Sequence, residues 1–136
     1  MESTTQLRVR YVETDAMGIV HHASYVAWLE LGRTELLRGL GQSYREWERA
    51  GVHLTVGEVH LKYRAPAYFD DLVDVRTLVA EAARRRVGFT YRIERGGVLL
   101  AEARTVHLAT GADGRARVLP DEFLKLLGGG CRTQQP

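Results

Sequence analysis

The sequence predicts an α+β fold in which an antiparallel sheet of about five strands wraps around one long central helix. Three observations predict it. Apolar residues recur with helical spacing over residues 25–40, which indicates a long amphipathic helix. From residue 54 onward, apolar residues gather in short strand-like segments. Turn signals at Gly96–Gly97 and Asp113–Gly114 separate the later segments. A helix with so apolar a face has to be covered, and the sheet is the element that can cover it.

The long helix is expected to follow a connecting loop over residues 13–22. Its apolar positions are Tyr25, Trp28, Leu29, Gly32, Leu36 and Leu40. These positions share one face of an α-helix, so that face should lie in the core. Glu30–Arg33 and Glu35–Arg38 are acidic–basic pairs at i,i+3 spacing, which favours a helix. The first pair is expected on the helix surface or at an interface.

A shorter helix is expected next, because Gly39 and Gly41 end the long one. Ser43 and Glu46 have the spacing of a capping box, which predicts a helix through about residue 50. Asp121 is expected to cap a last short helix before residue 128. The predicted strands are residues 7–12, 55–63, 72–81, 86–94 and 98–109.

The composition is typical of one globular domain. The chain has 136 residues, 45% of them hydrophobic and 26% charged, which is enough to bury a core and too apolar for disorder. We assign residues 1–127 to a single domain and residues 128–136 to a flexible C-terminal tail. No run approaches the ~20 apolar residues of a membrane-spanning helix, and the first seven residues lack the pattern of a signal peptide. A cytoplasmic protein is therefore expected, and the single cysteine, Cys131, cannot form an internal disulfide.

The net charge of the chain is too small to indicate a particular class of partner. The 19 basic and 17 acidic residues give a formal net charge of +2. So slight a basic balance does not imply nucleic acid, and none is expected as a partner. It suits a polyanionic small molecule such as a nucleotide.

The densest chemical signal lies in the loop before the long helix. Asp15 and Gly18 stand there, and the chain then passes through His21 and His22 into the helix at Tyr25. Backbone N–H groups at a helix start lack an intrahelical partner and, with the helix dipole, can stabilise a developing oxyanion. Asp15 is placed to attack a carbonyl carbon or to activate a water. Gly18 lets the backbone pass close to a substrate.

This segment resembles the signature of the hotdog-fold acyl-CoA thioesterases, in the 4-hydroxybenzoyl-CoA thioesterase branch that includes the Tol-Pal-associated enzymes. The pattern of that branch is an aspartate, then Gly-Val/Ile-Val, an aromatic residue, often a His, and a Tyr three residues later. It is carried here by Asp15, Gly18, Ile19, Val20, His21, His22 and Tyr25. The resemblance extends over residues 8–107 and includes Leu61-Lys62-Tyr63. One departure is His21, which stands where the family usually has an aromatic residue.

The resemblance implies a hotdog fold and the hydrolysis of an acyl-CoA to free acid and CoA. In similar enzymes the loop aspartate, here Asp15, is the nucleophile or the general base. A backbone N–H at His22 or its neighbour polarises the thioester carbonyl, and His22 itself counts among the active-site residues. The implied substrate contacts on this segment are Gly18, Ile19, Val20, His21 and Tyr25. No cofactor is implied, since CoA is part of the substrate. Active sites in the family form between two subunits of a homodimer, and homotetramers are common.

The same residues also have plainer interpretations. An aspartate in a Gly-containing loop is often a turn or capping residue. His21 and His22 suggest a metal, but adjacent residues rarely bind one ion together. No His-x-x-x-His or Cys cluster supports them, so no metal is expected. His22 as a helix-start residue without a chemical role, and His22 as an auxiliary acid or substrate contact, both stay open.

Two basic clusters are candidates to meet the phosphates of coenzyme A. Arg84, Arg85 and Arg86 form a run that is typical of a solvated turn between strands. Arg side chains also suit phosphate, so this run is a candidate contact. Lys62 and Arg64 compete for the same role.

Two other functions were weighed against a thioesterase. A hotdog enoyl- or hydroxyacyl-CoA hydratase would carry Asn-Pro between its Asp and its His, and this chain contains no Asn. A non-catalytic acyl-CoA-binding protein or scaffold is the second alternative, and the intact Asp15 argues against it.

Overall fold

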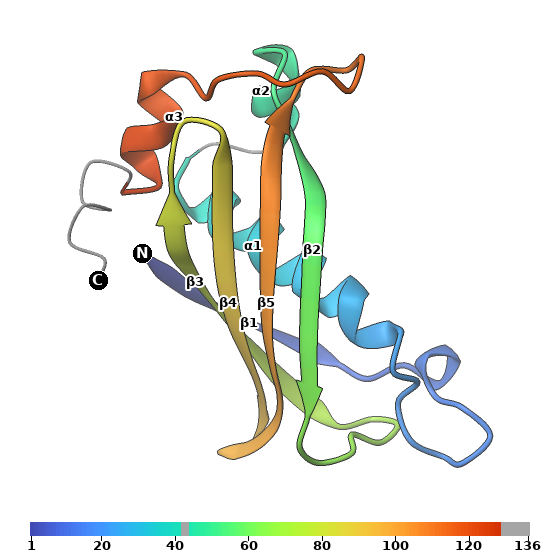
Figure 1. The fold of residues 1–136 in the computed structure, drawn as a ribbon. Helices are drawn as coiled ribbons and strands as arrows, with labels where there is room; N and C mark the ends of the chain where they lie inside the picture. The colour runs from blue at the N-terminus through green and yellow to red at the C-terminus, as the bar shows by residue number, and fades with distance from the viewer. Residues whose placement is uncertain (42–43, 129–136) are drawn as a thin grey trace.

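The computed structural model describes residues 1–41 and 44–128. Within them, a five-stranded antiparallel sheet in the order β1-β3-β4-β5-β2 lies against one long helix, α1 (Figure 1). The strands are β1 (Glu2–Arg8), β2 (His53–Tyr63), β3 (Leu72–Ala82), β4 (Arg86–Arg95) and β5 (Val98–Thr110). The helical elements are the 3-10 turn η1 (Tyr11–Glu13), α1 (Ser24–Gly39), α2 (Tyr44–Arg49) and α3 (Asp121–Leu126). This arrangement confirms the predicted α+β class, with the long helix inserted after the first strand.

The first strand differs from its prediction. Residues 7–12 were expected to be extended, but β1 ends at Arg8, and the chain then turns into η1. The pairing with β3 runs from Glu2–Leu78 to Arg8–Leu72. The half-buried residues of β1 begin with polar Ser3, so this strand lacks the apolar alternation by which strands are recognised. The other four strands extend one or two residues beyond their predicted ranges at most.

The predicted apolar face of α1 is the face that packs on the sheet. Tyr25, Trp28, Leu29, Gly32 and Leu36 are buried, and Leu40 after the helix end is half-buried. The buried residues of β3, β4 and β5 in the same core include Val73, Val75, Val87, Phe89, Ile93 and Leu100. Burial of this face removes a large apolar area from water, which is the main force that holds helix and sheet together.

The two predicted ion pairs on α1 have different outcomes. Glu35 and Arg38 are paired, whereas among the described residues Glu30 forms no ion pair with Arg33. Arg33 is half-buried, and its positive charge acts on the Tyr91 hydroxyl of β4 beneath the helix. The predicted pair of Glu30 with Arg33 is therefore not formed among the described residues, because the Arg33 side chain is turned toward polar groups of the sheet.

The two short helices contact each other at one end of the sheet. Trp47 of α2 stacks on Phe123 of α3, with ring centroids 4.5 Å apart. α2 confirms the predicted second helix, while Ser43 of its predicted capping box lies outside the described residues. The N-cap of α3 is Pro120, and Asp121 is the first helical residue rather than the cap. A carboxylate at that position still favours the helix through the dipole.

All but one of the buried apolar residues described between positions 9 and 127 form one cluster, and the exception is Val106. The predicted flexible tail, with Cys131, lies outside the described residues apart from Gly128. None of the described helices is long and apolar enough to cross a membrane.

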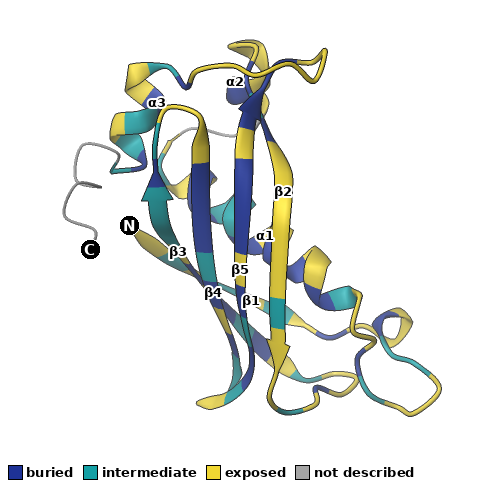
Figure 2. Ribbon diagram, in the orientation of Figure 1, coloured by how far each residue is buried: buried dark blue, intermediate teal, exposed yellow. Residues whose placement is uncertain are grey.

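β2 is an exposed edge strand. In the described chain it pairs with β5 alone, and most of its residues are exposed, with Leu54 buried (Figure 2). After β2, residues 64–71 run beside the loop that precedes α1. The N–H of Val20 donates to the carbonyl of Ala67 at 2.9 Å and fastens that loop to this segment. The free edge of the sheet and the loop with the candidate site therefore meet at one end of the molecule.

Candidate active site

The loop before α1 folds back on itself around Asp15. The N–H of Asp15 donates to the carbonyl of Ile19 (2.8 Å), and the N–H of Gly18 donates to the carbonyl of Asp15 (3.0 Å). Gly18 has φ of +83°, which glycine adopts without strain. The N–H of Met17 donates to Asp15 Oδ1 at 2.8 Å, an Asx turn. Within the described residues Asp15 Oδ2 has no hydrogen-bond donor, so the turn occupies one carboxylate oxygen and leaves the other open.

The entry into α1 leaves one backbone donor open. The N–H of His21 donates to the carbonyl of Glu13 (2.8 Å), and the N–H of Ser24 donates to the carbonyl of His21 (2.9 Å). The N–H of Ala23 donates to Nδ1 of His21 (3.0 Å). The N–H of His22, by contrast, has no hydrogen-bond acceptor in the part of the chain that the structure describes. This donor stands two residues before α1, where the helix dipole adds positive potential.

His22 is held through its backbone rather than its ring. Its carbonyl accepts the hydroxyl of Tyr63 at 2.9 Å. Its exposed imidazole stacks on that of His21, with ring centroids 4.1 Å apart. Among the described residues, no three His, Cys, Asp or Glu side chains are grouped so that they could hold a metal ion.

A cavity of about 460 Å³ opens between this loop, the start of α1 and the end of β2. Its lining residues are Asp15, Met17, Ile19, Val20, His22, Tyr25, Tyr63, Arg64, Ala65 and Pro66. Of the residues predicted on the loop, Gly18 and His21 lie outside this lining, and the others belong to it. Arg64 joins them from the segment after β2, whereas Lys62 lines a neighbouring cavity.

Two tyrosines form one wall of this cavity. The rings of Tyr25 and Tyr63 meet edge to face, with centroids 5.0 Å apart. Burial raises the pKa of both phenols, so both remain protonated and able to donate at neutral pH. Sequence reasoning missed Tyr63 as a site residue. The signal that could have found it is its place in the Leu61-Lys62-Tyr63 segment, which the family resemblance also covers.

Glu13 is a second carboxylate that sequence reasoning missed. Burial by itself would raise the pKa of Glu13, but hydrogen bonds from the Arg10 backbone, from Trp28 and from the Arg10 side chain hold it below its usual value. Glu13 is therefore ionised at neutral pH although its side chain is buried. No local pattern marks such a residue, because its partner Trp28 lies on the following helix.

The two basic clusters lie at different ends of the sheet. Arg84 and Arg85 lie in the turn between β3 and β4, and Arg86 is the first residue of β4; Figure 1 places this turn beside α3 and away from the loop before α1. Arg64 lines the cavity that holds Asp15, and its guanidinium pairs with Glu102 at 2.7 Å. Within one copy of the chain, only the cluster of Lys62 and Arg64 is therefore close to Asp15.

Among the described residues, two groups on the lining of this cavity are of the kinds that an attack on a carbonyl uses. Asp15 offers an unbound carboxylate oxygen, and His22 offers an unbound N–H at a helix start, on the lining of one cavity. The N–H suits the oxygen of a polarised carbonyl, and the carboxylate suits the attack on its carbon. An antiparallel sheet wrapped on one long helix defines the class as a hotdog fold.

The chain belongs to the Thioesterase-like superfamily, whose sequence profile matches residues 9–127. The acyl-CoA thioesterase YbgC of Haemophilus influenzae is 36% identical over 104 residues, which cover 76% of each chain. The structure of the hypothetical protein TT1821 from Thermus thermophilus matches with a TM-score of 0.89 and 45% identity, over 94% of this chain and 96% of that one. The DHNA-CoA thioesterase of Staphylococcus aureus matches with a TM-score of 0.88 and 27% identity, over 98% and 91% of the two chains. These similarities confirm the family and the hotdog architecture, and they make the chain a thioester hydrolase.

Proposed function

We propose that this enzyme hydrolyses the thioester of an acyl-CoA to a free acid and CoA. One observation carries the proposal: Asp15, with an unbound carboxylate oxygen, and His22, with an unbound N–H, line the same cavity. The similarity to YbgC from H. influenzae, an acyl-CoA thioesterase, supports the substrate class. The reaction uses no cofactor, since CoA is part of the substrate, and we expect it to take place in the cytoplasm.

In the proposed complex, the thioester carbonyl oxygen accepts the N–H of His22. Negative charge develops on this oxygen as the carbonyl carbon is attacked, and the dipole of α1 stabilises it. Loss of one such donor in an oxyanion site typically slows a reaction by about 10²- to 10³-fold. The His22 ring is proposed as an auxiliary acid or as a substrate contact, since it belongs to a residue on the lining of the same cavity.

Asp15 has two possible roles in the attack. As a nucleophile, its carboxylate forms a C–O bond to the acyl carbon while the C–S bond breaks, and the CoA thiolate takes a proton from solvent. Water then hydrolyses the acyl anhydride. As a general base, Asp15 removes a proton from a water that attacks the same carbon. The C–S bond then breaks, and the proton passes from Asp15 to the leaving CoA thiolate. A single turnover in ¹⁸O-labelled water tests the nucleophilic route, because label found in the Asp15 carboxylate requires the anhydride.

The proposed active unit is a homodimer, with the homotetramers common in the family as the larger assembly. β2 exposes the main-chain groups of an 11-residue edge strand, and such an edge pairs readily with another strand. Antiparallel pairing of β2 with β2 of a second copy would place the sheet of the second copy in the opposite direction, with opposite ends of the two sheets side by side. The β3–β4 turn of the second copy would then lie at the end where the first copy holds Asp15.

This geometry favours Arg84 and Arg85 as the contacts to the CoA phosphates. Among the described residues, neither guanidinium is in an ion pair, whereas Arg64 is paired with Glu102. An unpaired Arg fork suits phosphate and loses no carboxylate partner when it binds. We therefore place the nucleotide between the cavity of one copy and the β3–β4 turn of the other.

The deciding experiment is thiol release from a panel of acyl-CoAs with short, long and aromatic acyl groups. Asp15→Asn keeps the acceptor for the Met17 N–H but removes the attacking carboxylate, so we expect turnover to fall about 10²- to 10⁴-fold. Asp113→Asn is the matched control, because Asp113 Oδ1 accepts the N–H of Arg115 (3.0 Å) in a similar turn away from the cavity. A near-native Asp15→Asn enzyme would contradict the assignment. Binding without thiol release would indicate an acyl-CoA-binding protein, and water addition to an enoyl-CoA would indicate a hydratase.

A further inference from the structure

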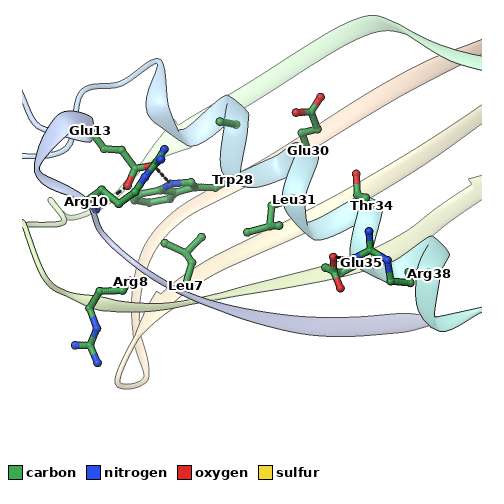
Figure 3. Close-up of a pocket in the computed structure, with 11 residues that line it drawn as sticks. Leu7, Arg8, Arg10, Glu13, Trp28, Glu30, Leu31, Thr34, Glu35 and Arg38 are labelled. Carbon is green, nitrogen blue, oxygen red and sulfur yellow. Dashed lines mark hydrogen bonds and ion pairs between the residues drawn. The ribbon is translucent and has the colours of Figure 1, made fainter. Parts of the chain in front are cut away.

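The side chain of Glu13 fastens the start of the Asp15 loop to α1. The indole Nε1 of Trp28, in the second turn of α1, donates to Glu13 Oε2 at 2.9 Å. The backbone N–H of Arg10 donates to Glu13 Oε1 at 2.8 Å, and the Arg10 guanidinium lies 3.4 Å from Oε2 (Figure 3). Only 8% of Glu13 is exposed, so water competes little for these bonds. Both carboxylate oxygens are therefore committed to holding the chain in place.

The backbone of Glu13 fastens the other end of the same loop. Its carbonyl accepts the N–H of His21 at 2.8 Å and the hydroxyl of Ser24 at 3.1 Å. His21 is the last residue before His22, and Ser24 is the first residue of α1. One residue thus joins the beginning of the loop, the end of the loop and the helix.

The loop between these two anchor points is short and closed. Thr14 and Val20 form an isolated β-bridge, and the N–H of Asp15 donates to the carbonyl of Ile19 inside it. Glu13 is adjacent to Thr14 and two positions from Asp15. The position of the Asp15 carboxylate relative to the His22 N–H therefore depends on how firmly Glu13 holds both ends.

We propose that Glu13 is a positioning residue that sets the Asp15 carboxylate against the N–H of His22. This inference rests on the proposed function and assigns a second carboxylate to the same site. Glu13 lines a groove on the outer side of α1 and does not line the cavity that holds Asp15. Its role is to fix two groups that act together, and a displacement of about 1 Å between such groups can slow a reaction about 10²-fold. Removal of its charge should lower kcat and leave KM nearly unchanged.

The test compares Glu13→Gln with Glu35→Gln, using two independent readouts. In Glu13→Gln, one carboxylate oxygen becomes an NH₂ group, which faces N–H donors and repels them. We expect kcat to fall about 10- to 100-fold with KM within about twofold. We also expect the amide hydrogens of Asp15 and His21 to exchange at least about 10-fold faster, with the amides of β4 unchanged. Glu35→Gln removes a carboxylate from the same outer groove beside α1. Among the described residues Glu35 pairs with Arg38 alone, and the variant should change neither readout.

The two readouts separate this inference from the proposed function. If wild-type enzyme releases no thiol from any acyl-CoA, the proposed function is wrong, and loop exchange alone then decides the role of Glu13. Unchanged exchange at Asp15 and His21 in Glu13→Gln would overturn the inference. A fall in kcat accompanied by an equal rise in KM would also overturn it. If Glu13→Gln does not fold, Trp28→Phe removes the indole donor from the other side, and the same faster exchange is expected.

Discussion

Gly32 of α1 lies against Thr77 of β3 so closely that no side chain fits between helix and sheet. A Cβ atom placed on Gly32 would collide with the Thr77 hydroxyl and lie 2.9 Å from Cγ1 of Val75. Gly32 and Thr77 are both buried. This close approach lets the rest of the apolar face of α1 reach the sheet. Glycine is needed here because of the space, although it is a poor helix former.

Gly32→Ala should therefore destabilise the fold. Overpacking of a core costs about 1–3 kcal/mol, and alanine recovers up to about 1 kcal/mol over glycine within a helix. We expect a net loss of about 1–2 kcal/mol in the free energy of unfolding, measured by urea titration. Gly39→Ala, on the same helix with nothing within 4 Å of the added carbon, is the control. Equal stability of the two variants would show that the contact is not tight.

Tyr63→Phe should reduce turnover without unfolding the protein. The Tyr63 hydroxyl donates to the carbonyl of His22 at 2.9 Å and so holds the residue that carries the proposed oxyanion donor. A hydrogen bond of this kind contributes about 0.5–1.5 kcal/mol, so kcat should fall about 2- to 10-fold. Tyr68→Phe is a matched control, because Tyr63 and Tyr68 are 46% and 47% exposed and no described residue binds the Tyr68 hydroxyl. The prediction fails if the two variants have the same kcat.

His107 should make the fold sensitive to mild acid. It is buried on β5, where Nε2 lies 2.9 Å from Thr105 Oγ1. Burial, together with the positive charge of Arg33, lowers the pKa of His107 from 6.5 to about 4. Between these two values the unfolded chain binds a proton that the folded chain does not. The free energy of unfolding therefore has its full value above pH 6.5, and it falls by about 3 kcal/mol as the pH drops to about 4.

The measurement is the free energy of unfolding in urea at several values between pH 7 and pH 4. His107→Gln should flatten its pH dependence by up to about 1.4 kcal/mol per pH unit. An unchanged slope in His107→Gln would mean that this histidine is protonated as readily in the folded chain as in the unfolded one.

Local sequence patterns were sufficient to predict the elements that have one buried face and one exposed face. The apolar face of α1 could be predicted because one side of the helix contacts the sheet and the other contacts solvent. The buried residues therefore recur with the helical period. The loop around Asp15 could be predicted because its turn-forming residues and the family motif are both contained in a few adjacent positions. β1 was misplaced because polar residues such as Ser3 and Thr5 face inward, and their burial is decided by the helix above them.

Contacts between distant residues could not be predicted from local patterns. The Tyr63 hydroxyl reaches His22 across 41 positions of sequence, and the Glu13 carboxylate reaches Trp28 across 15. Arg33 has the spacing of a surface pair, yet its side chain is turned toward Tyr91 on β4. Each of these contacts depends on how the helix packs on the sheet. The spacing of residues along the chain does not determine that packing.

The contact with the CoA phosphates can be located by charge reversal in two places. We expect Arg84→Glu/Arg85→Glu to raise KM for an acyl-CoA about 10- to 100-fold, because two guanidinium groups that favour phosphate are replaced by carboxylates that repel it. Lys62→Glu/Arg64→Glu should raise it less, since Arg64 is already neutralised by Glu102 at 2.7 Å. Steady-state thiol release at low ionic strength measures both, since salt screens exposed charges.

A matched substrate distinguishes phosphate contacts from general damage. The same acyl group on pantetheine lacks the phosphates and the adenosine, so its KM should be equal in wild type and Arg84→Glu/Arg85→Glu. A rise in KM for both substrates would instead mean that the variant distorts the cavity around Asp15. If the larger effect on acyl-CoA comes from Lys62→Glu/Arg64→Glu, the nucleotide lies along β2 of the copy that holds the acyl group. In that case the β3–β4 turn of a second copy does not bind the nucleotide. The result would then contradict a nucleotide site shared between two copies.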